Sequence, residues 1–183
     1  QTPLAPHTLV RDIHALPPGA CLRWKVGARG TARQWWTIPD ATEKAPAREI
    51  LVEETDRLLA QAVKDQLVAD VPLGAFLSGG IDSSCVVALM AELSGGRQQT
   101  FSIGYLEDFP YNELKYARIV SDHFNTEHHE VIVKAAHTEY LPQLVWHMSE
   151  PFADPVILST FMVSQLAVRN VKVVLTGEGA DEL

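Results

Sequence analysis

The chain turns from an apolar strand into a helix at Phe76-Leu77-Ser78-Gly79-Gly80-Ile81-Asp82-Ser83-Ser84. Such a turn aims backbone amides and the positive end of a helix dipole at one point, which suits a phosphate group. Gly79 and Gly80 have no Cβ, so a phosphate can approach their backbone closely. The three serines add hydroxyl groups, and Asp82 suits the site if Mg²⁺ arrives with the phosphates. A tight turn before a capped helix is the alternative interpretation.

Strand and helix patterns alternate on both sides of this loop. Short apolar runs predict strands at 73–77, 100–104, 128–133 and 171–175. Helical patterns fill the gaps between them at 82–93, 112–124, 140–148 and 157–169. Strands that alternate with helices of this length predict an α/β fold. We expect a parallel sheet with helices on both faces and the loop at its carboxyl edge.

A further amphipathic helix is predicted from Ala47 onward, before the first of these strands. Its apolar stripe consists of Ile50, Leu51, Leu58, Leu59, Ala62, Val63 and Leu67.

Residues 1–40 differ in pattern from the rest of the chain. A turn at 16–19 is followed by strand patterns at 21–26 and 31–38, with a reversal at 27–30. This predicts a β-hairpin anchored by tryptophans. Cys21 falls within a strand pattern and is interpreted as a packing residue. Residues 41–46 are interpreted as a polar linker, and residues 47–183 as a second domain.

Composition excludes several classes of protein. The 183 residues include 15 basic and 23 acidic side chains, for a net charge of −8. We therefore expect no nucleic-acid partner. No apolar run approaches the roughly 20 residues that span a bilayer, so no membrane partner is expected. Two isolated cysteines support neither a disulfide framework nor a zinc site. These features predict a cytoplasmic protein, and the start at Gln1 and stop at Leu183 are interpreted as those of a fragment.

A second cluster, Thr176-Gly177-Glu178-Gly179-Ala180-Asp181-Glu182, follows the last predicted strand. Three crowded carboxylates repel one another and need a cation or capping amides. In parallel sheets, ligands bind beyond the carboxyl ends of the strands where the strand order reverses. If the strands at 73–77 and 171–175 are neighbours, this cluster faces the loop at 78–84. The alternative is an acidic loop that caps the next helix.

The loop at 78–84 resembles the PP-loop of ATP pyrophosphatases, which cleave ATP between the α and β phosphates. Four further blocks, at 71–77, 100–105, 150–155 and 175–182, resemble the synthetase domain of glutamine-dependent asparagine synthetases and occur in that family's order. This resemblance covers about residues 47–183. Residues 1–40 resemble the last hairpin of the same family's class II glutamine amidotransferase domain. The N-terminal nucleophilic cysteine expected of such a domain is missing from this chain.

The resemblance implies a ligase that uses ATP and Mg²⁺. Such an enzyme adenylates a carboxylate, most directly aspartate, releases pyrophosphate, and transfers glutamine-derived ammonia to give asparagine. Two alternatives stay open: a related amidotransferase with another acid acceptor, and an ATP-binding module that is inactive as a fragment. A tRNA-thiolating enzyme is disfavoured by the acidic charge and the lack of paired cysteines. The oligomeric state is left open, with a homodimer of the full-length protein as one option.

The resemblance also implies roles for individual residues. Catalysis is assigned to Asp82, Asp181 and Glu178. Asp82 and Asp181 would share Mg²⁺, and Glu178 would position or deprotonate the ammonia. Contacts to ATP are assigned to the following residues: Leu77, Ser78, Gly79, Gly80, Asp82, Ser83, Ser84, Ile103, Thr176 and Gly177. Asp154 is either a helix N-cap or a cleft residue.

Overall fold

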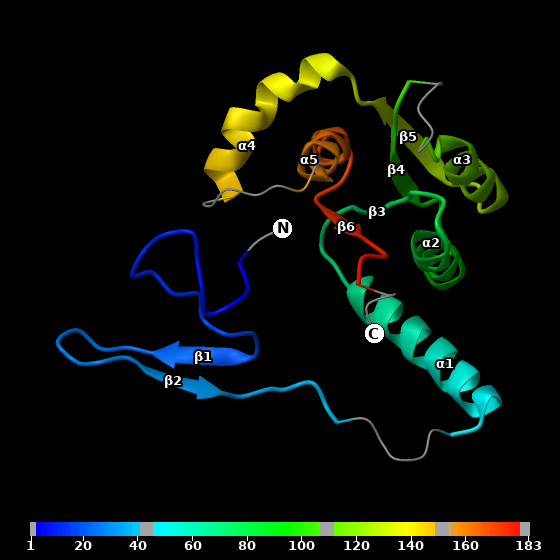
Figure 1. Ribbon diagram of the computed structural model, residues 1–183. Helices are drawn as coiled ribbons and strands as arrows, with labels where there is room; N and C mark the ends of the chain where they lie inside the picture. Colours follow the sequence, from blue (N-terminus) through cyan, green and yellow to red (C-terminus); the bar gives the residue numbers. More distant parts are fainter. Residues whose placement is uncertain (1–2, 41–45, 107–111, 149–153, 155, 180–183) are drawn as a thin grey trace. The chain divides into compact units, whose positions relative to one another are not determined.

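The computed structural model describes residues 3–40, 46–106, 112–148, 154 and 156–179 (Figure 1). The chain divides into two compact units. One comprises residues 1–46 with 142–154, and the other comprises residues 47–141 with 155–183.

The larger unit contains a four-stranded sheet. Its strands are β3 (Leu73–Phe76), β4 (Gln99–Gly104), β5 (Glu127–Ile132) and β6 (Val173–Leu175). They are all parallel and lie in the order β5-β4-β3-β6. The predicted parallel α/β fold is thus confirmed. The main difference is in β6, which begins two residues later than the apolar run at 171–175 suggests. Val171 packs in the core just before the strand.

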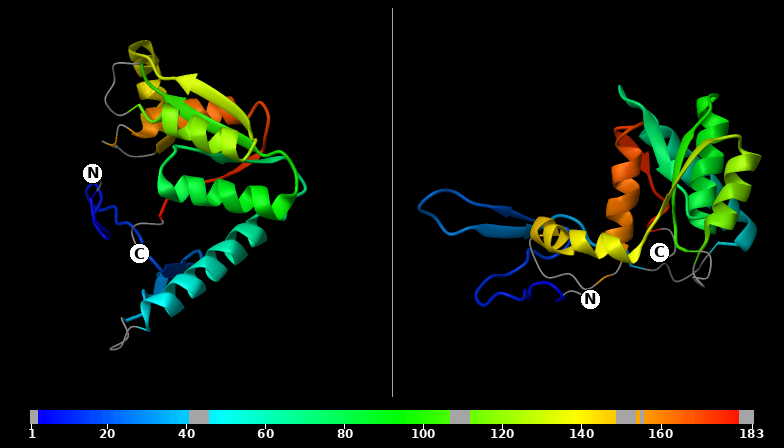
Figure 2. Two further views of the ribbon diagram at one scale, coloured as in Figure 1. Left: turned by 90° about the vertical axis from the view of Figure 1, so that its right-hand side faces the viewer. Right: turned by 90° about the horizontal axis from the view of Figure 1, so that it is seen from above.

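The helices of this unit cover both faces of the sheet (Figure 2). They are α1 (Arg48–Gln66), α2 (Ile81–Ser94), α3 (Leu114–His123) and α5 (Val156–Ala167). A 3₁₀ helix, η1 (Ala135–Tyr140), also belongs to this unit, whereas α4 (Leu141–Met148) belongs to the smaller unit from Pro142 onward. Helix α2 stops at Gly95, which has a left-handed φ of 63°. The sequence predicts this C-cap, because glycine adopts that conformation without steric cost.

The core consists of two clusters, one on each face of the sheet, because successive side chains along a strand point to opposite faces. On one face, Ala75 and Leu77 pack against α2, together with Val63 of α1 and Ala117 of α3. On the other face, Phe101 packs against Val163 and Ala167 of α5. Phe76, Ile103 and Val174 pack at the margin of this second cluster.

Helix α1 differs from the prediction in its packing. Of its expected apolar stripe, Val63 is buried and Leu67 packs against the core. Ile50 and Leu58 lie in the stripe as well, yet they are 58% and 53% exposed. The helix packs against α2, and it runs away from the sheet toward its N-terminal end (Figure 1).

The smaller unit contains the predicted hairpin. β1 (Ala20–Arg23) pairs antiparallel with β2 (Thr31–Gln34), with Cys21 opposite Arg33. Both strands are shorter than predicted. Cys21 is exposed, so its interpretation as a packing residue is wrong. None of the helices in the described part of the chain is long and apolar enough to cross a membrane.

Candidate functional site

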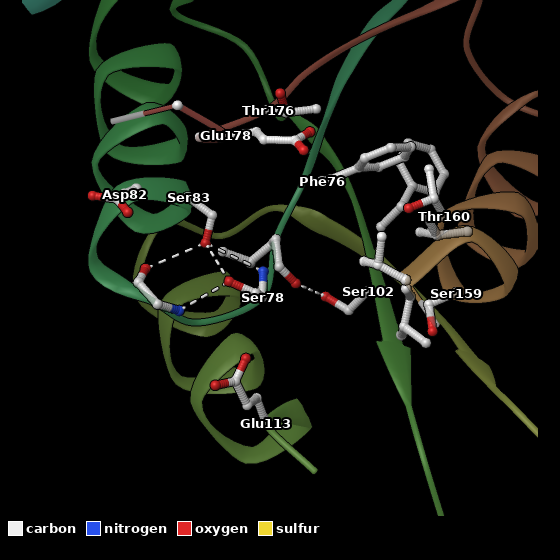
Figure 3. A pocket seen from close by; sticks show the side chains of 18 of the residues that line it. Phe76, Ser78, Asp82, Ser83, Ser102, Glu113, Ser159, Thr160, Thr176 and Glu178 are labelled. Carbon is white, nitrogen blue, oxygen red and sulfur yellow. Dashed lines mark hydrogen bonds between the residues drawn. The ribbon is translucent and has the colours of Figure 1, made fainter. Parts of the chain in front are cut away.

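A cavity of about 530 Å³ opens at the carboxyl ends of β3, β4 and β6 (Figure 3). The chain runs from β3 to β4 to β5 in one direction and then places β6 on the other side of β3. The strand order therefore reverses between β3 and β6, where parallel sheets leave a crevice for ligands. The predicted neighbours at 73–77 and 171–175 do pair, with Gly74 opposite Val174. As a result, the loop at 78–84 and the described part of the 176–182 cluster line the same cavity.

The loop after β3 is held in shape by its own serines. The backbone N–H of Ser78 donates to Ser83 Oγ (3.2 Å), and that of Gly80 donates to Ser78 Oγ (3.1 Å). The two hydroxyl oxygens lie 2.9 Å apart. Ser84 Oγ donates to the Gly80 carbonyl at 2.6 Å, which uses the only proton of that hydroxyl. The serines thus preorganise the loop, and Ser84 can donate to a phosphate only if its present bond breaks.

The first turn of α2 supplies the donors that the loop does not use internally. Gly80 is the N-cap and offers no side chain to the first helical amides. The amides of residues 81–83 have no acceptor within the helix, because the first turn of any α-helix lacks them. Together with the helix dipole, these amides favour an anion at the entrance of α2.

Two glycines fix the loop against its neighbours. Gly79 has a φ of +86°, and a Cβ there would lie 2.5 Å from the Ala117 backbone N in α3. Gly177 packs on the entrance of α2, where a Cβ would lie 2.6 Å from the Ser83 backbone N. The loop is therefore enclosed between α3 and the segment that follows β6.

All charged side chains among the described lining residues are acidic: Asp82, Glu113 and Glu178. In Figure 3, Asp82 stands on the first turn of α2 and Glu178 extends over the end of β3, with their carboxylates pointing in different directions. Asp181, the second predicted Mg²⁺ ligand, lies outside the described residues. Within the described ranges, no group of three His, Cys, Asp or Glu side chains could hold a metal. Asp82 nevertheless fits Mg²⁺, which in proteins is held by one or two carboxylates and completed by substrate phosphates.

Leu77 and Ile103, two of the residues assigned to ATP, occupy different environments. Leu77 is only 1% exposed and belongs to the core beneath α2, so its backbone, and not its side chain, faces the cavity. Its carbonyl oxygen accepts a hydrogen bond from the buried Ser102 hydroxyl. Ile103 lines the cavity with its side chain half-buried beside Phe101.

Apart from Ile103, the wall formed by α5 and the end of β4 was not predicted. It includes Ser159 and Thr160 of α5, and Tyr105 after β4. The Tyr105 hydroxyl lies 2.8 Å from Ser159 Oγ and so links the two elements. The available signal was a pair of hydroxyl side chains in the otherwise apolar pattern of 156–163. Glu113, just before α3, also lines the cavity and was not identified from the sequence. Of the residues assigned to ATP, Thr176, Ser78 and Gly80 line the cavity. Gly79 instead packs on α3, and Ser84 is hydrogen-bonded to the Gly80 carbonyl.

The parallel sheet and the loop after β3 give a fold of the PP-loop type. The same fold occurs in glutamine-dependent NAD⁺ synthetase from Acinetobacter baumannii, solved in complex with ADP, with a TM-score of 0.53 and 21% identity. That match covers 77% of this chain and 28% of the other.

More particularly, the chain belongs to the asparagine synthase family, whose sequence model matches residues 54–183. A relative from Methanocaldococcus jannaschii is 42% identical over 151 residues, which are 81% of this chain and 29% of that protein. Glutamine-hydrolyzing asparagine synthetase 1 of Bacillus subtilis is 37% identical over 182 residues, which are 97% of this chain and 28% of that protein. The chain thus spans less than a third of the length of these relatives.

Proposed function

We propose that this chain is the ATP-binding part of an ATP-dependent amide ligase that converts aspartate to asparagine with glutamine-derived ammonia. The observation that carries the proposal is the preorganised loop at the strand-order reversal, with the first turn of α2 open to an anion. Membership of the asparagine synthase family supports the choice of reaction. The reaction consumes ATP and free amino acids, and we expect it in the cytoplasm.

The chemistry divides into two steps. First, an oxygen of the acceptor carboxylate attacks the α-phosphorus of ATP, and pyrophosphate leaves. The amides of residues 81–83 and the loop would stabilise the negative charge that develops on pyrophosphate. Mg²⁺, when bound, would neutralise part of this charge. Second, ammonia attacks the acyl carbon, AMP leaves, and the nitrogen loses a proton.

The acidic lining of the cavity supports the proposal that a divalent cation binds together with ATP. The polyphosphate of ATP would meet the carboxylates of Asp82, Glu113 and Glu178, and like charges repel. A cation between the phosphates and Asp82 converts this repulsion into attraction. We assign Asp82 and Asp181 to Mg²⁺.

The remaining contacts follow from the cavity walls. We assign contacts to the adenine base to the backbone of Leu77 and the side chain of Ile103, and further contacts to ATP to Thr176 and Gly177. Glu178 lies between two glycines and extends into the cavity, which suits a role in positioning or deprotonating ammonia. Residues 1–40 are proposed to be the end of a glutamine amidotransferase domain.

The test is ATP–pyrophosphate exchange by the full-length protein with a panel of carboxylates. Exchange that depends on aspartate supports the proposal, and exchange with a different acid identifies a related amidotransferase. ATP binding without exchange for any acid indicates a binding module and contradicts the ligase assignment.

Glu178→Gln separates the two steps. We expect exchange to persist while amide formation falls. If both fall together, Glu178 belongs with Asp82 at the metal, and if neither changes, the residue has no role in the reaction. Glu92→Gln is the matched control, since Glu92 lies on α2 and is exposed outside the cavity.

A further inference from the structure

The first turn of α3 packs directly behind the phosphate loop. A Cβ at Gly79 would lie 2.5 Å from the Ala117 backbone N and 2.6 Å from Tyr116 Cβ, both in α3. Ala117 is fully buried at this contact. Because the backbones touch with no side chain between them, the position of the loop depends on the position of α3.

Helix α3 is joined to β5 by a charged pair. Arg118 follows Ala117 directly, and its Nε and Nη2 each donate to a carboxylate oxygen of Glu130 at 2.7 Å. This bidentate geometry fixes the relative orientation of the two side chains more closely than a single hydrogen bond does. Glu130 Oε1 also lies 3.3 Å from Nε2 of His128, which precedes it by two residues on the same face of β5, although the two atoms form no hydrogen bond.

The polar contacts continue from His128 back to α3. His128 Nδ1 lies 2.9 Å from Thr100 Oγ1 in β4, which lies 2.7 Å from Thr126 Oγ1. The Thr126 hydroxyl donates to Ser121 Oγ of α3 at 3.1 Å. The contacts therefore form a ring that starts and ends on α3 and passes through two strands. We call it the α3 ring.

Because members of the α3 ring are buried, the ring constrains the position of α3 on the sheet. Thr100, Ser121 and Thr126 are 0%, 3% and 4% exposed. An apolar interface tolerates sliding, because burial of apolar surface has no preferred direction. Buried polar groups do not tolerate it, because a shift of the helix would leave them unpaired. The α3 ring therefore specifies where α3 lies on the sheet.

We propose that Glu130 is a positioning residue for the phosphate loop, acting through Arg118 and the first turn of α3. Glu130 does not line the cavity, so it acts on the nucleotide indirectly, and its bonds from Arg118 lead to the turn of α3 that packs on Gly79. The proposal rests on the assignment of residues 78–84 as the phosphate loop.

The test compares Glu130→Gln with Glu127→Gln in the full-length protein. Glu127 is the matched control: it lies in the same strand and accepts a hydrogen bond from Gln99 at 2.8 Å, outside the α3 ring. Amide hydrogen exchange is followed in peptides that cover the loop and in peptides that cover α3. We expect Glu130→Gln to speed the exchange of the loop amides by roughly fivefold or more, and Glu127→Gln to leave it unchanged.

A second readout is the dissociation constant of ATP. Glu130→Gln should raise it about 3- to 10-fold, and Glu127→Gln should not change it. Hydrogen exchange needs no nucleotide, so a wild-type protein that fails to bind ATP would contradict the proposed function while the positioning role is still tested. Faster exchange in α3 and β5 with the loop unchanged overturns the positioning role, because Glu130 would then only stabilise the fold.

If Glu130→Gln does not fold, Arg118→Lys takes its place. This variant keeps the positive charge at position 118 but cannot form the bidentate pair with Glu130. We expect a smaller change of loop exchange in the same direction. Loop exchange at the wild-type rate, with α3 exchange raised, would overturn the proposal.

Discussion

Gly177→Ala tests how tightly the segment after β6 packs on the phosphate loop. An added Cβ would lie 2.6 Å from the Ser83 backbone N and 2.7 Å from the Asp82 carbonyl carbon. Ordinary contact begins at 3.4 Å, so the two segments must separate by about 0.8 Å. Both obstructing atoms belong to the backbone, so no side-chain rotation relieves the contact. Gly177 does not have a positive φ, so alanine adds steric overlap without backbone strain.

We expect this overlap to affect activity more than stability. Overpacking of this kind costs about 1–3 kcal/mol. A displacement of about 1 Å at a reacting centre can lower a rate on the order of 100-fold. ATP–pyrophosphate exchange by full-length Gly177→Ala should therefore fall roughly 10- to 100-fold, while thermal unfolding shifts by a few degrees.

Gly96→Ala is the control for this prediction. It makes the same chemical change near the other end of α2, where the nearest heavy atom to an added Cβ is 4.0 Å away. Its exchange rate and unfolding temperature should match the wild type. If Gly177→Ala catalyses ATP–pyrophosphate exchange at the wild-type rate, the close packing of Gly177 on α2 is refuted.

Three further predictions follow from the site and the α3 ring. Asp82→Asn should keep the fold and reduce Mg²⁺-dependent pyrophosphate release about 10-fold or more; an unchanged rate at limiting Mg²⁺ would contradict the metal role. Ser102→Ala should lower the free energy of unfolding by about 1–3 kcal/mol, because it leaves the buried Leu77 carbonyl without its Ser102 donor. Urea titration measures this change, and an unaltered midpoint of unfolding would count against the hydrogen bond. Burial lowers the pKa of His128 below its ordinary 6.5, with an opposing contribution from Glu130, so the unfolded chain takes up a proton before the folded chain does. Stability should therefore fall as pH decreases through 6.5, and His128→Gln should lose less stability than the wild type between about pH 7.5 and 5.5; equal losses would refute the assignment.

Acidification also acts on Glu130, in a lower range of pH. Its hydrogen bonds from Arg118 are the largest cause that lowers its pKa from the ordinary 4.5. A carboxylate with a lowered pKa stabilises the fold above its ordinary value and loses that contribution as pH falls below it. The His128 contribution is therefore measured above pH 4.5, where Glu130 stays charged.

The sequence predicts those parts of the fold that depend on local pattern. The alternation of short apolar runs with helical stretches predicts the strands and helices within a few residues, and Gly95 marks the end of α2. The loop at 78–84 is equally local, because strand, glycines and helix start follow one another along the chain. Helix α1 shows the limit: its stripe predicts a helix, but not that Ile50 and Leu58 are exposed.

The tertiary structure alone decided which of these segments meet. Residues 176–179 line the same cavity as the loop because β6 pairs with β3, a choice that no local pattern encodes. Tyr105 and Ser159 are 54 residues apart in the chain and share a hydrogen bond across the cavity wall. The same holds for Arg118 and Glu130, whose contact requires α3 to lie on β5. The physical reason is that local patterns depend on the geometry of single strands and helices. The site depends on the order of the strands in the sheet and on where the helices pack against it.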